Sequence, residues 1–149
     1  MTVKQKIFHQ FQQMLETKIN GLQQQLNDLK ESTANETKST AGDKYETARA
    51  MLQIEQDNTR RQLQEALEQL SIFTAIDISI SSREIIRGSL VKTNKGYLFL
   101  SVALGKIITG EITVIALSPQ SPLGKQLMGL QVNDSTAINN VTYTIEEIL

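Results

Sequence analysis

Three carboxylates in one short polar stretch are the best candidates for chemistry in this sequence. Residues 33–46, TANETKSTAGDKYE, contain Glu36, Asp43 and Glu46. Side chains three apart share one side of a helix, so Asp43 and Glu46 can face the same hard cation, such as Mg²⁺. Two protein oxygens are too few to hold Mg²⁺ tightly, so a metal site here requires a second macromolecule. Taken alone, the stretch favours helix capping, with Asp43 as N-cap and Glu46 in a capping-box position.

Two helical patterns flank this stretch and must position it. Apolar side chains recur every three or four residues from about 3 to 32, which is a heptad-like stripe. Its members are Phe8, Phe11, Leu15, Ile19, Leu22, Leu26 and Leu29. The second stripe runs from about residue 43 to 70 or 73 and consists of Ala48, Leu52, Gln56, Thr59, Leu63, Ala66, Leu70 and Phe73.

Helices of nearly equal length predict an antiparallel coiled-coil hairpin with its tip at about 33–46. Gln56 and Thr59 interrupt the apolar seam, so we expect its centre to be solvated and weakly packed. Glu36, Asp43 and Glu46 then lie at the tip.

The second half of the chain has the pattern of a small β-rich domain. Strands are predicted at residues 85–93, 97–102, 111–117, 136–138 and 141–148. Turns are expected at 94–96 and 139–140. One helix is expected between Ser121 as N-cap, Pro122 in its first turn and Gly129 as terminator. These elements predict an α+β protein in which a hairpin (1–74) precedes an antiparallel β domain with one short helix (75–149).

Composition excludes several classes of protein. The chain has no cysteine, which excludes disulfides and cysteine-ligated zinc. A formal net charge of −1 argues against autonomous DNA binding. No apolar run resembles a signal peptide or a membrane span, so we expect a cytoplasmic protein without membrane contact. The single histidine, His9, is expected to be exposed or to flank the seam, and no catalytic motif is present, so the chain is not expected to be an enzyme.

Motifs in both halves resemble one known family. Residues 121–129, SPLGKQLMG, are similar to the S-P-x-(G/A)-x-x-L-x-G segment of the bacterial Gre transcript-cleavage factors. Val132 and Asp134 resemble that family's V-G-D turn, and residues 141–148 resemble its closing strand. At the tip, residues 42–46, GDKYE, are similar to the family's G-D-x-x-E.

The resemblance implies a fold and an activity. The second domain would be FKBP-like and would dock on bacterial RNA polymerase through Ser121, Pro122 and Gln120. The hairpin would enter the polymerase's secondary channel, where Asp43 and Glu46 would help to hold a Mg²⁺ shared with the polymerase active site. The polymerase would then cleave its own backtracked RNA, and the nascent RNA 3′ end would be met only indirectly.

Further expectations and alternatives follow from the same resemblance. Tyr45 and Arg49 are candidates for contact with RNA or polymerase, Glu36 is a secondary acidic candidate, and no cofactor is expected to bind tightly. An alternative alignment matches Tyr45, Ala48 and Arg49 to the family's Tyr, Ala and Arg, which places Lys38 and Ala41 at the acidic positions. In that alignment the chain would be a secondary-channel regulator that does not stimulate cleavage. A third reading is a coiled-coil adaptor or structural protein unrelated to polymerase.

Overall fold

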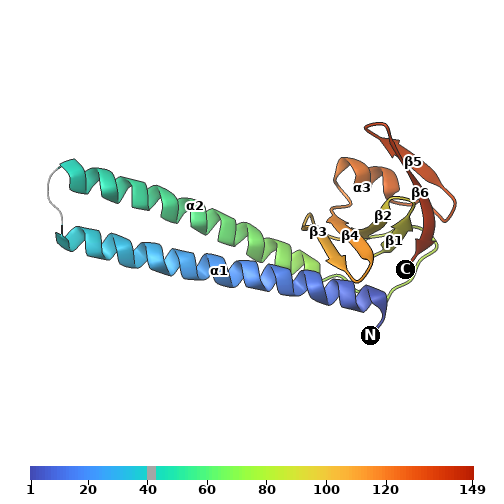
Figure 1. The fold of residues 1–149 in the computed structure, drawn as a ribbon, viewed down its shortest axis with the longest axis horizontal. Helices are drawn as coiled ribbons and strands as arrows, with labels where there is room; N and C mark the ends of the chain where they lie inside the picture. The colour runs from blue at the N-terminus through green and yellow to red at the C-terminus, as the bar shows by residue number, and fades with distance from the viewer. Residues whose placement is uncertain (40–42) are drawn as a thin grey trace. The chain divides into compact units, whose positions relative to one another are not determined.

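The chain folds into two compact units. The computed structural model describes residues 1–39 and 43–149, with side chains described for 1–35 and 46–149. Residues 13–71 form one unit, here called the hairpin unit. Residues 1–12 and 72–149 together form the other, here called the sheet unit. The helices precede the sheet in sequence, which confirms the predicted α+β class (Figure 1).

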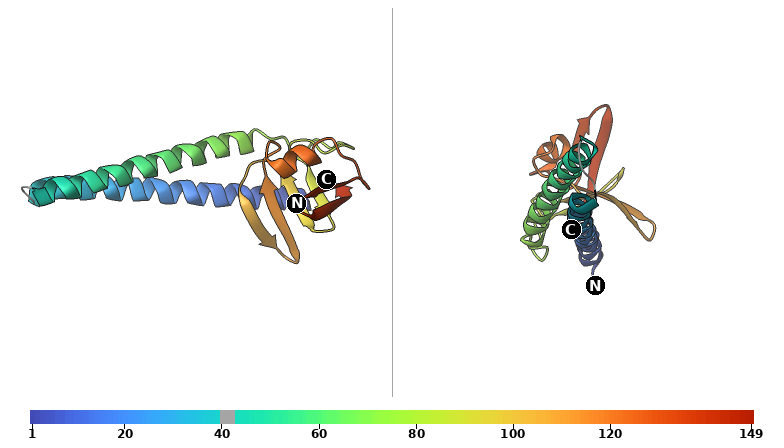
Figure 2. Two further views of the ribbon diagram at one scale, coloured as in Figure 1. Left: turned by 90° about the horizontal axis from the view of Figure 1, so that it is seen from above. Right: turned by 90° about the vertical axis from the view of Figure 1, so that its left-hand side faces the viewer.

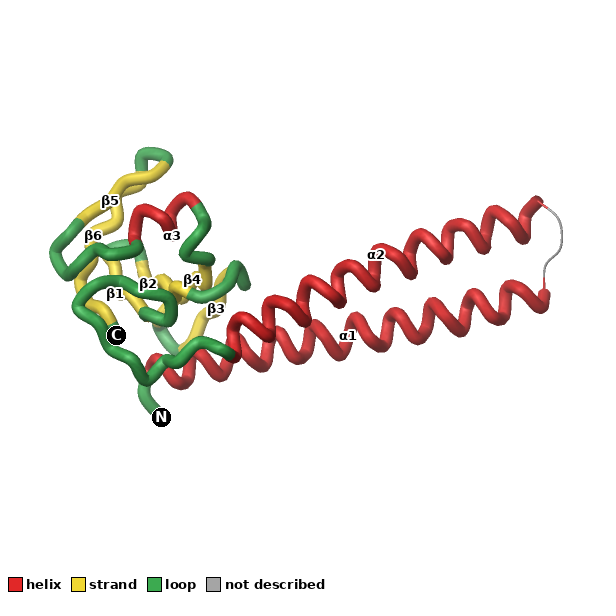
Figure 3. The backbone as a smooth tube through the Cα atoms, turned by 180° about the vertical axis from the view of Figure 1, so that it is seen from behind, coloured by secondary structure: helices red, strands yellow, loops and turns green. Residues whose placement is uncertain are grey.

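Two long helices, α1 (Val3–Ser39) and α2 (Asp43–Thr74), build the hairpin unit. They lie side by side in Figures 1 and 3. Ile19 and Leu22 of α1 pack against Ala66, and Leu63 and Leu70 flank this contact. The predicted end of the first helix near residue 32 was wrong. The run after residue 32 contains no Pro or Gly to end a helix, so α1 continues to Ser39.

The polar centre of the seam is buried, contrary to the prediction that it would be solvated. Gln56 is 5% exposed and Thr59 is 2% exposed. The Gln56 amide donates to the Thr33 hydroxyl at 2.6 Å, and the Gln25 amide donates to the Thr59 hydroxyl at 3.3 Å. Burial is tolerated because each polar group meets a partner on the facing helix.

Six strands form the sheet of the sheet unit, in the order β3-β4-β2-β1-β6-β5. Their bounds are β1 Leu90–Thr93, β2 Gly96–Leu100, β3 Gly105–Thr109, β4 Ile112–Leu117, β5 Ser135–Ile138 and β6 Val141–Ile148. The β3–β4 and β5–β6 hairpins form the two opposite edges of the sheet (Figure 2).

The sheet is mixed, so the prediction of a purely antiparallel sheet was wrong. β4 lies between β2 and β3, antiparallel to β3 and parallel to β2. The strand β3 was also missed, because it begins with a glycine and its two adjacent isoleucines break the apolar–polar alternation in sequence. The structure does alternate: Ile107 is buried and Ile108 is 64% exposed.

Both predicted turns are confirmed. Asn139 and Asn140 have φ values of 52° and 66°, and they join Ile138 to its partner Val141 in a two-residue hairpin turn. Asn94 and Lys95 join β1 to β2, with Gly96 at φ 111°. Asparagine and glycine tolerate these left-handed conformations.

Each face of the sheet buries an apolar cluster within the sheet unit. One face packs against α3 (Pro122–Leu127) and includes Val91, Leu98 and Leu127. On the other face, Phe99 contacts Phe8, Phe11 and Phe73, with ring centroids 5.9–6.5 Å away. The first turns of α1 and the last turn of α2 therefore complete the core of the sheet unit.

Candidate functional site

Of the acidic residues predicted at the tip, Glu46 is the one whose side chain is described. It is exposed in the first turn of α2, where a carboxylate stabilises the positive end of the helix dipole. Arg49, three residues on, is exposed on the same side of the helix. The side chains of Glu36, Asp43 and Tyr45 lie outside the described residues.

No group of three or more metal-ligating side chains gathers among the described residues. Glu46 supplies carboxylate oxygen, which is the ligand type that Mg²⁺ prefers. One exposed carboxylate at a helix start cannot hold such an ion alone. A metal at this place therefore needs ligands in addition to Glu46.

Two exposed apolar side chains lie near the start of α2. Met51 is 62% exposed and Ile54 is 60% exposed, and their spacing of three places them on one side of the helix. Sequence reasoning missed this pair because it falls outside the seam stripe.

The predicted docking residues lie in residues 118–124, here called the corner, a loop that leads into α3 and is held by several local hydrogen bonds. Ser121 is the N-cap of α3, as predicted, and its hydroxyl accepts from the Gly124 amide at 3.0 Å. The same hydroxyl donates to the Ser118 carbonyl at 2.7 Å. Gln120 and Pro122, on either side of Ser121, are both exposed. Ser121 thus shapes the corner, while its two neighbours form its accessible surface.

Close packing inside the corner requires glycine at position 124. A Cβ atom on Gly124 would lie 2.1 Å from the Ser118 carbonyl oxygen and 2.9 Å from the Pro119 Cα. Both are backbone atoms, so a side chain cannot be accommodated by a rotamer change. Leu127, one turn later, is fully buried against the sheet.

A second turn of the resemblance, at 132–134, is also well defined. Asn133 adopts φ 76°, at the position where the family motif has glycine. The Asp134 carboxylate accepts from the Gln131 backbone amide at 2.8 Å, and the Ile145 backbone amide donates to the Asp134 backbone carbonyl at 2.9 Å. The turn therefore ties the segment after α3 to β6.

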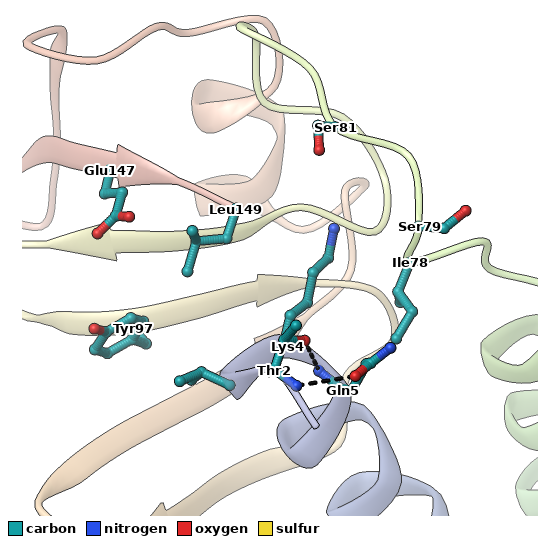
Figure 4. A pocket seen from close by; sticks show the side chains of 10 residues that line it. Thr2, Lys4, Gln5, Ile78, Ser79, Ser81, Tyr97, Glu147 and Leu149 are labelled. Carbon is teal, nitrogen blue, oxygen red and sulfur yellow. Dashed lines mark hydrogen bonds between the residues drawn. The ribbon is translucent and has the colours of Figure 1, made fainter.

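A pocket of about 550 Å³ lies within the sheet unit, and sequence reasoning did not anticipate it (Figure 4). Its walls are the first turn of α1 and the segment 78–81, and Tyr97 and Glu147 lie along its sheet side. Thr2 and Gln5 form a reciprocal cap at the start of α1. The Thr2 backbone amide donates to the Gln5 side-chain oxygen at 2.9 Å, and the Gln5 backbone amide donates to the Thr2 hydroxyl at 3.1 Å.

Lys4 is the buried cation of this pocket. It is 8% exposed, and its ammonium donates to the Ile80 carbonyl at 3.4 Å. Burial lowers the pKa of Lys4, and the charge of Asp77 opposes this only in part. Hydrogen bonds from Ser79 lower the pKa of the Asp77 carboxyl. With Glu147 also in the lining, the pocket presents charges of both signs, and Lys4 serves to tie α1 to the 78–81 segment.

Comparison with family models, with curated proteins and with solved structures found no match. Within the described residues, no helix is long and apolar enough to cross a membrane.

Proposed function

We propose that this chain is a Gre-like transcription elongation factor. It binds bacterial RNA polymerase in the cytoplasm, enters the secondary channel with its hairpin, and stimulates cleavage of backtracked RNA by the polymerase active site. In this proposal the sheet unit is FKBP-like and the chain itself is not an enzyme. The observation that carries the proposal is the joint presence of a long helical hairpin and a Ser-Pro-capped helix on a mixed sheet.

The tip carboxylates act on the polymerase's metal in this proposal. Glu46 is exposed at the start of α2 and is free of the seam, so a partner can reach it. With Asp43, it would hold a Mg²⁺ whose remaining ligands come from polymerase and RNA. That ion, when bound, supplies charge stabilisation and an activated water for phosphoryl transfer. Arg49 lies one turn further and is suited to contact phosphate.

Docking would use the corner at 118–124. The exposed Gln120 and Pro122 would contact polymerase, while Ser121 fixes the corner through its two local hydrogen bonds. The exposed pair Met51 and Ile54 offers apolar contact to the channel wall near the tip.

A transcript-cleavage assay tests this proposal. The purified chain is added to a backtracked elongation complex of its own polymerase, and shortening of end-labelled RNA is followed. We expect faster cleavage with the unmodified chain. Asp43→Asn with Glu46→Gln should lower the rate by about 10- to 100-fold or more, as loss of metal-site groups does. Glu55→Gln with Glu65→Gln, two exposed carboxylates elsewhere on α2, is the matched control and should leave the rate unchanged.

Three results would contradict the proposal. Binding to polymerase without faster cleavage would identify a channel regulator instead. Absence of binding to polymerase would favour the alternative of a coiled-coil adaptor or structural protein. Cleavage that survives the Asp43 and Glu46 substitutions would remove the metal role from the tip.

A further inference from the structure

A layer of four polar side chains crosses the seam of the hairpin unit: two are buried, one is half-buried and Gln25 is exposed. The polar layer consists of Gln25 and Thr33 on α1 and Gln56 and Thr59 on α2. The Gln56 amide donates to the Thr33 hydroxyl at 2.6 Å and to the Leu29 carbonyl at 3.4 Å. Thr33 in turn donates to the Leu29 carbonyl at 2.9 Å, so its hydroxyl acts as both acceptor and donor.

The buried polar atoms of the layer all have hydrogen-bond partners. The Gln56 carbonyl oxygen accepts from Arg60 at 3.2 Å, and Arg60 pairs with Asp57 at 3.2 Å. No buried side-chain nitrogen or oxygen among the described residues lacks a hydrogen-bond partner. The layer therefore carries no unpaired group that would destabilise the closed hairpin.

Apolar burial is unequal on the two sides of the polar layer. On the side away from the turn, residues 13–24 and 60–71 are here called the inner segment. Leu15, Ile19, Leu22 and Ala66 are at most 7% exposed there. On the turn side, the described residues 34–35 and 46–55 are here called the outer segment. None of its side chains is buried, and its best-covered ones, Ala48 and Leu52, are only half-buried.

We propose that the polar layer is a break point, at which the outer segment separates and re-pairs while the inner segment stays closed. The proposal is independent of the function proposed above.

The energetics of the layer support this behaviour. Opening an apolar layer exposes hydrocarbon to water, which has no compensating interaction to offer. Opening the polar layer exchanges hydrogen bonds between side chains for hydrogen bonds to water. It also exposes Leu26, which is 9% exposed in the closed hairpin, but this is one leucine against the several apolar side chains of the inner segment. The outer segment adds few apolar contacts to resist separation. A helix without its partner is marginal in water, so each separated arm also exposes its backbone amides.

Hydrogen exchange followed by mass spectrometry on the full chain tests the proposal. Peptides from the outer segment should exchange by local opening, at rates insensitive to low urea concentrations. Peptides from the inner segment should exchange more slowly and respond to urea as global unfolding does. Equal protection of the two segments would overturn the proposal.

Variants in the layer separate a break point from simple fraying of helix ends. Thr33→Val with Gln56→Leu replaces hydrogen bonds by apolar contact and should slow exchange of the outer segment by about tenfold or more. Gln56→Ala removes the side-chain amide without adding an apolar contact and should make the outer segment exchange faster. The matched control, Thr17→Val with Gln23→Leu, makes the same changes at exposed positions of the inner segment and should leave exchange of the outer segment unchanged. If the exchange rate of the outer segment is the same in both layer variants as in the unmodified chain, the proposal is overturned.

Discussion

The ring of Phe8 stacks on the ring of Phe73, with centroids 4.5 Å apart and planes 12° from parallel. Phe8 belongs to the start of α1 and Phe73 to the end of α2, yet both lie in the sheet unit. Phe99 of β2 meets the edge of the Phe73 ring at 5.9 Å. The aromatic core of the sheet unit thus depends on helical residues that precede residue 75.

Removing the Phe73 ring should therefore destabilise the sheet. Phe73 is fully buried, so Phe73→Ala should lower the free energy of unfolding of the sheet unit by about 3–5 kcal/mol. Urea denaturation followed through the NMR amide signals of β1, β2 and β6 measures this. Ile72→Ala, at a 46% exposed neighbour, is the control and should change stability by about 0.5 kcal/mol or less. Unchanged sheet stability in Phe73→Ala would contradict the aromatic core.

Loss of the Ser121 hydroxyl should weaken the corner before α3. Ser121→Ala removes the bond from the Gly124 backbone amide and one of the two bonds to the Ser118 carbonyl, which still accepts from the Ser121 backbone amide at 3.0 Å. We expect a loss of about 1 kcal/mol in the free energy of unfolding, typical of N-cap replacement. Chemical denaturation measures the change, with Ser81→Ala at an exposed loop position as control. A stability equal to that of the unmodified chain would refute the cap.

Two glycine substitutions should act in opposite directions. Gly124→Ala places a Cβ against backbone atoms of Ser118 and Pro119 and should cost about 1–3 kcal/mol, as overpacking does. A Cβ on Gly21, within α1, meets nothing within 4 Å. Gly21→Ala should therefore stabilise the hairpin by about 0.5–1 kcal/mol through helix propensity. Thermal denaturation of the two variants gives the signs, and equal signs would contradict one of the two local structures.

The buried Lys4 should make stability rise in alkaline solution. Because burial lowers its pKa, the folded chain releases the Lys4 proton at lower pH than the unfolded chain does. Between the folded pKa and the ordinary value of 10.5, the unfolded state holds more protons, so the free energy of unfolding increases with pH. Below that window the folded state bears the full penalty of the buried charge.

Lys4→Met tests this dependence. The variant should be at least as stable as the unmodified chain at pH 7, since it removes a buried charge while keeping the apolar stem. Its alkaline rise should be smaller. Urea denaturation at several values of pH up to 10.5 measures both. A variant that is less stable at pH 7 would show that the bond from Lys4 to the Ile80 carbonyl outweighs the cost of burying the charge. A variant that keeps the full rise would show that Lys4 is not its source.

Local signals predicted much of the fold. The apolar stripes of α1 and α2 repeat over many turns, and Ser121-Pro122 and Asn139-Asn140 carry their own capping and turn chemistry. The parallel pairing of β2 with β4 had no such signal, because it arises when β4 inserts between two strands that are consecutive in sequence. Strand periodicity reports which face is buried, not which strand is the neighbour.

The candidate sites also divide into those with a local sequence signal and those that depend on partners distant in sequence. The Ser121 cap was predictable because donor and acceptor lie three residues apart. The partners Thr33 and Gln56 lie on facing helices, and the walls of the Lys4 pocket come from both ends of the chain and from residues 78–81. The sequence placed Gln56 and Thr59 in the seam, but their burial could not be predicted because it depends on hydrogen-bond partners on the facing helix.

The composition of the sheet unit from residues 1–12 and 72–149 has a consequence for the order of folding. The hairpin unit is an insertion in the sequence of the sheet unit. Joining Phe8 to Phe99 before the hairpin forms would close a long flexible loop, whose entropy loss grows with its length. Contacts within the hairpin, such as that of Ile19 with Ala66, shorten the loop that remains to be closed. We therefore expect the hairpin unit to form before the sheet, so weakening its inner segment should slow the appearance of the sheet.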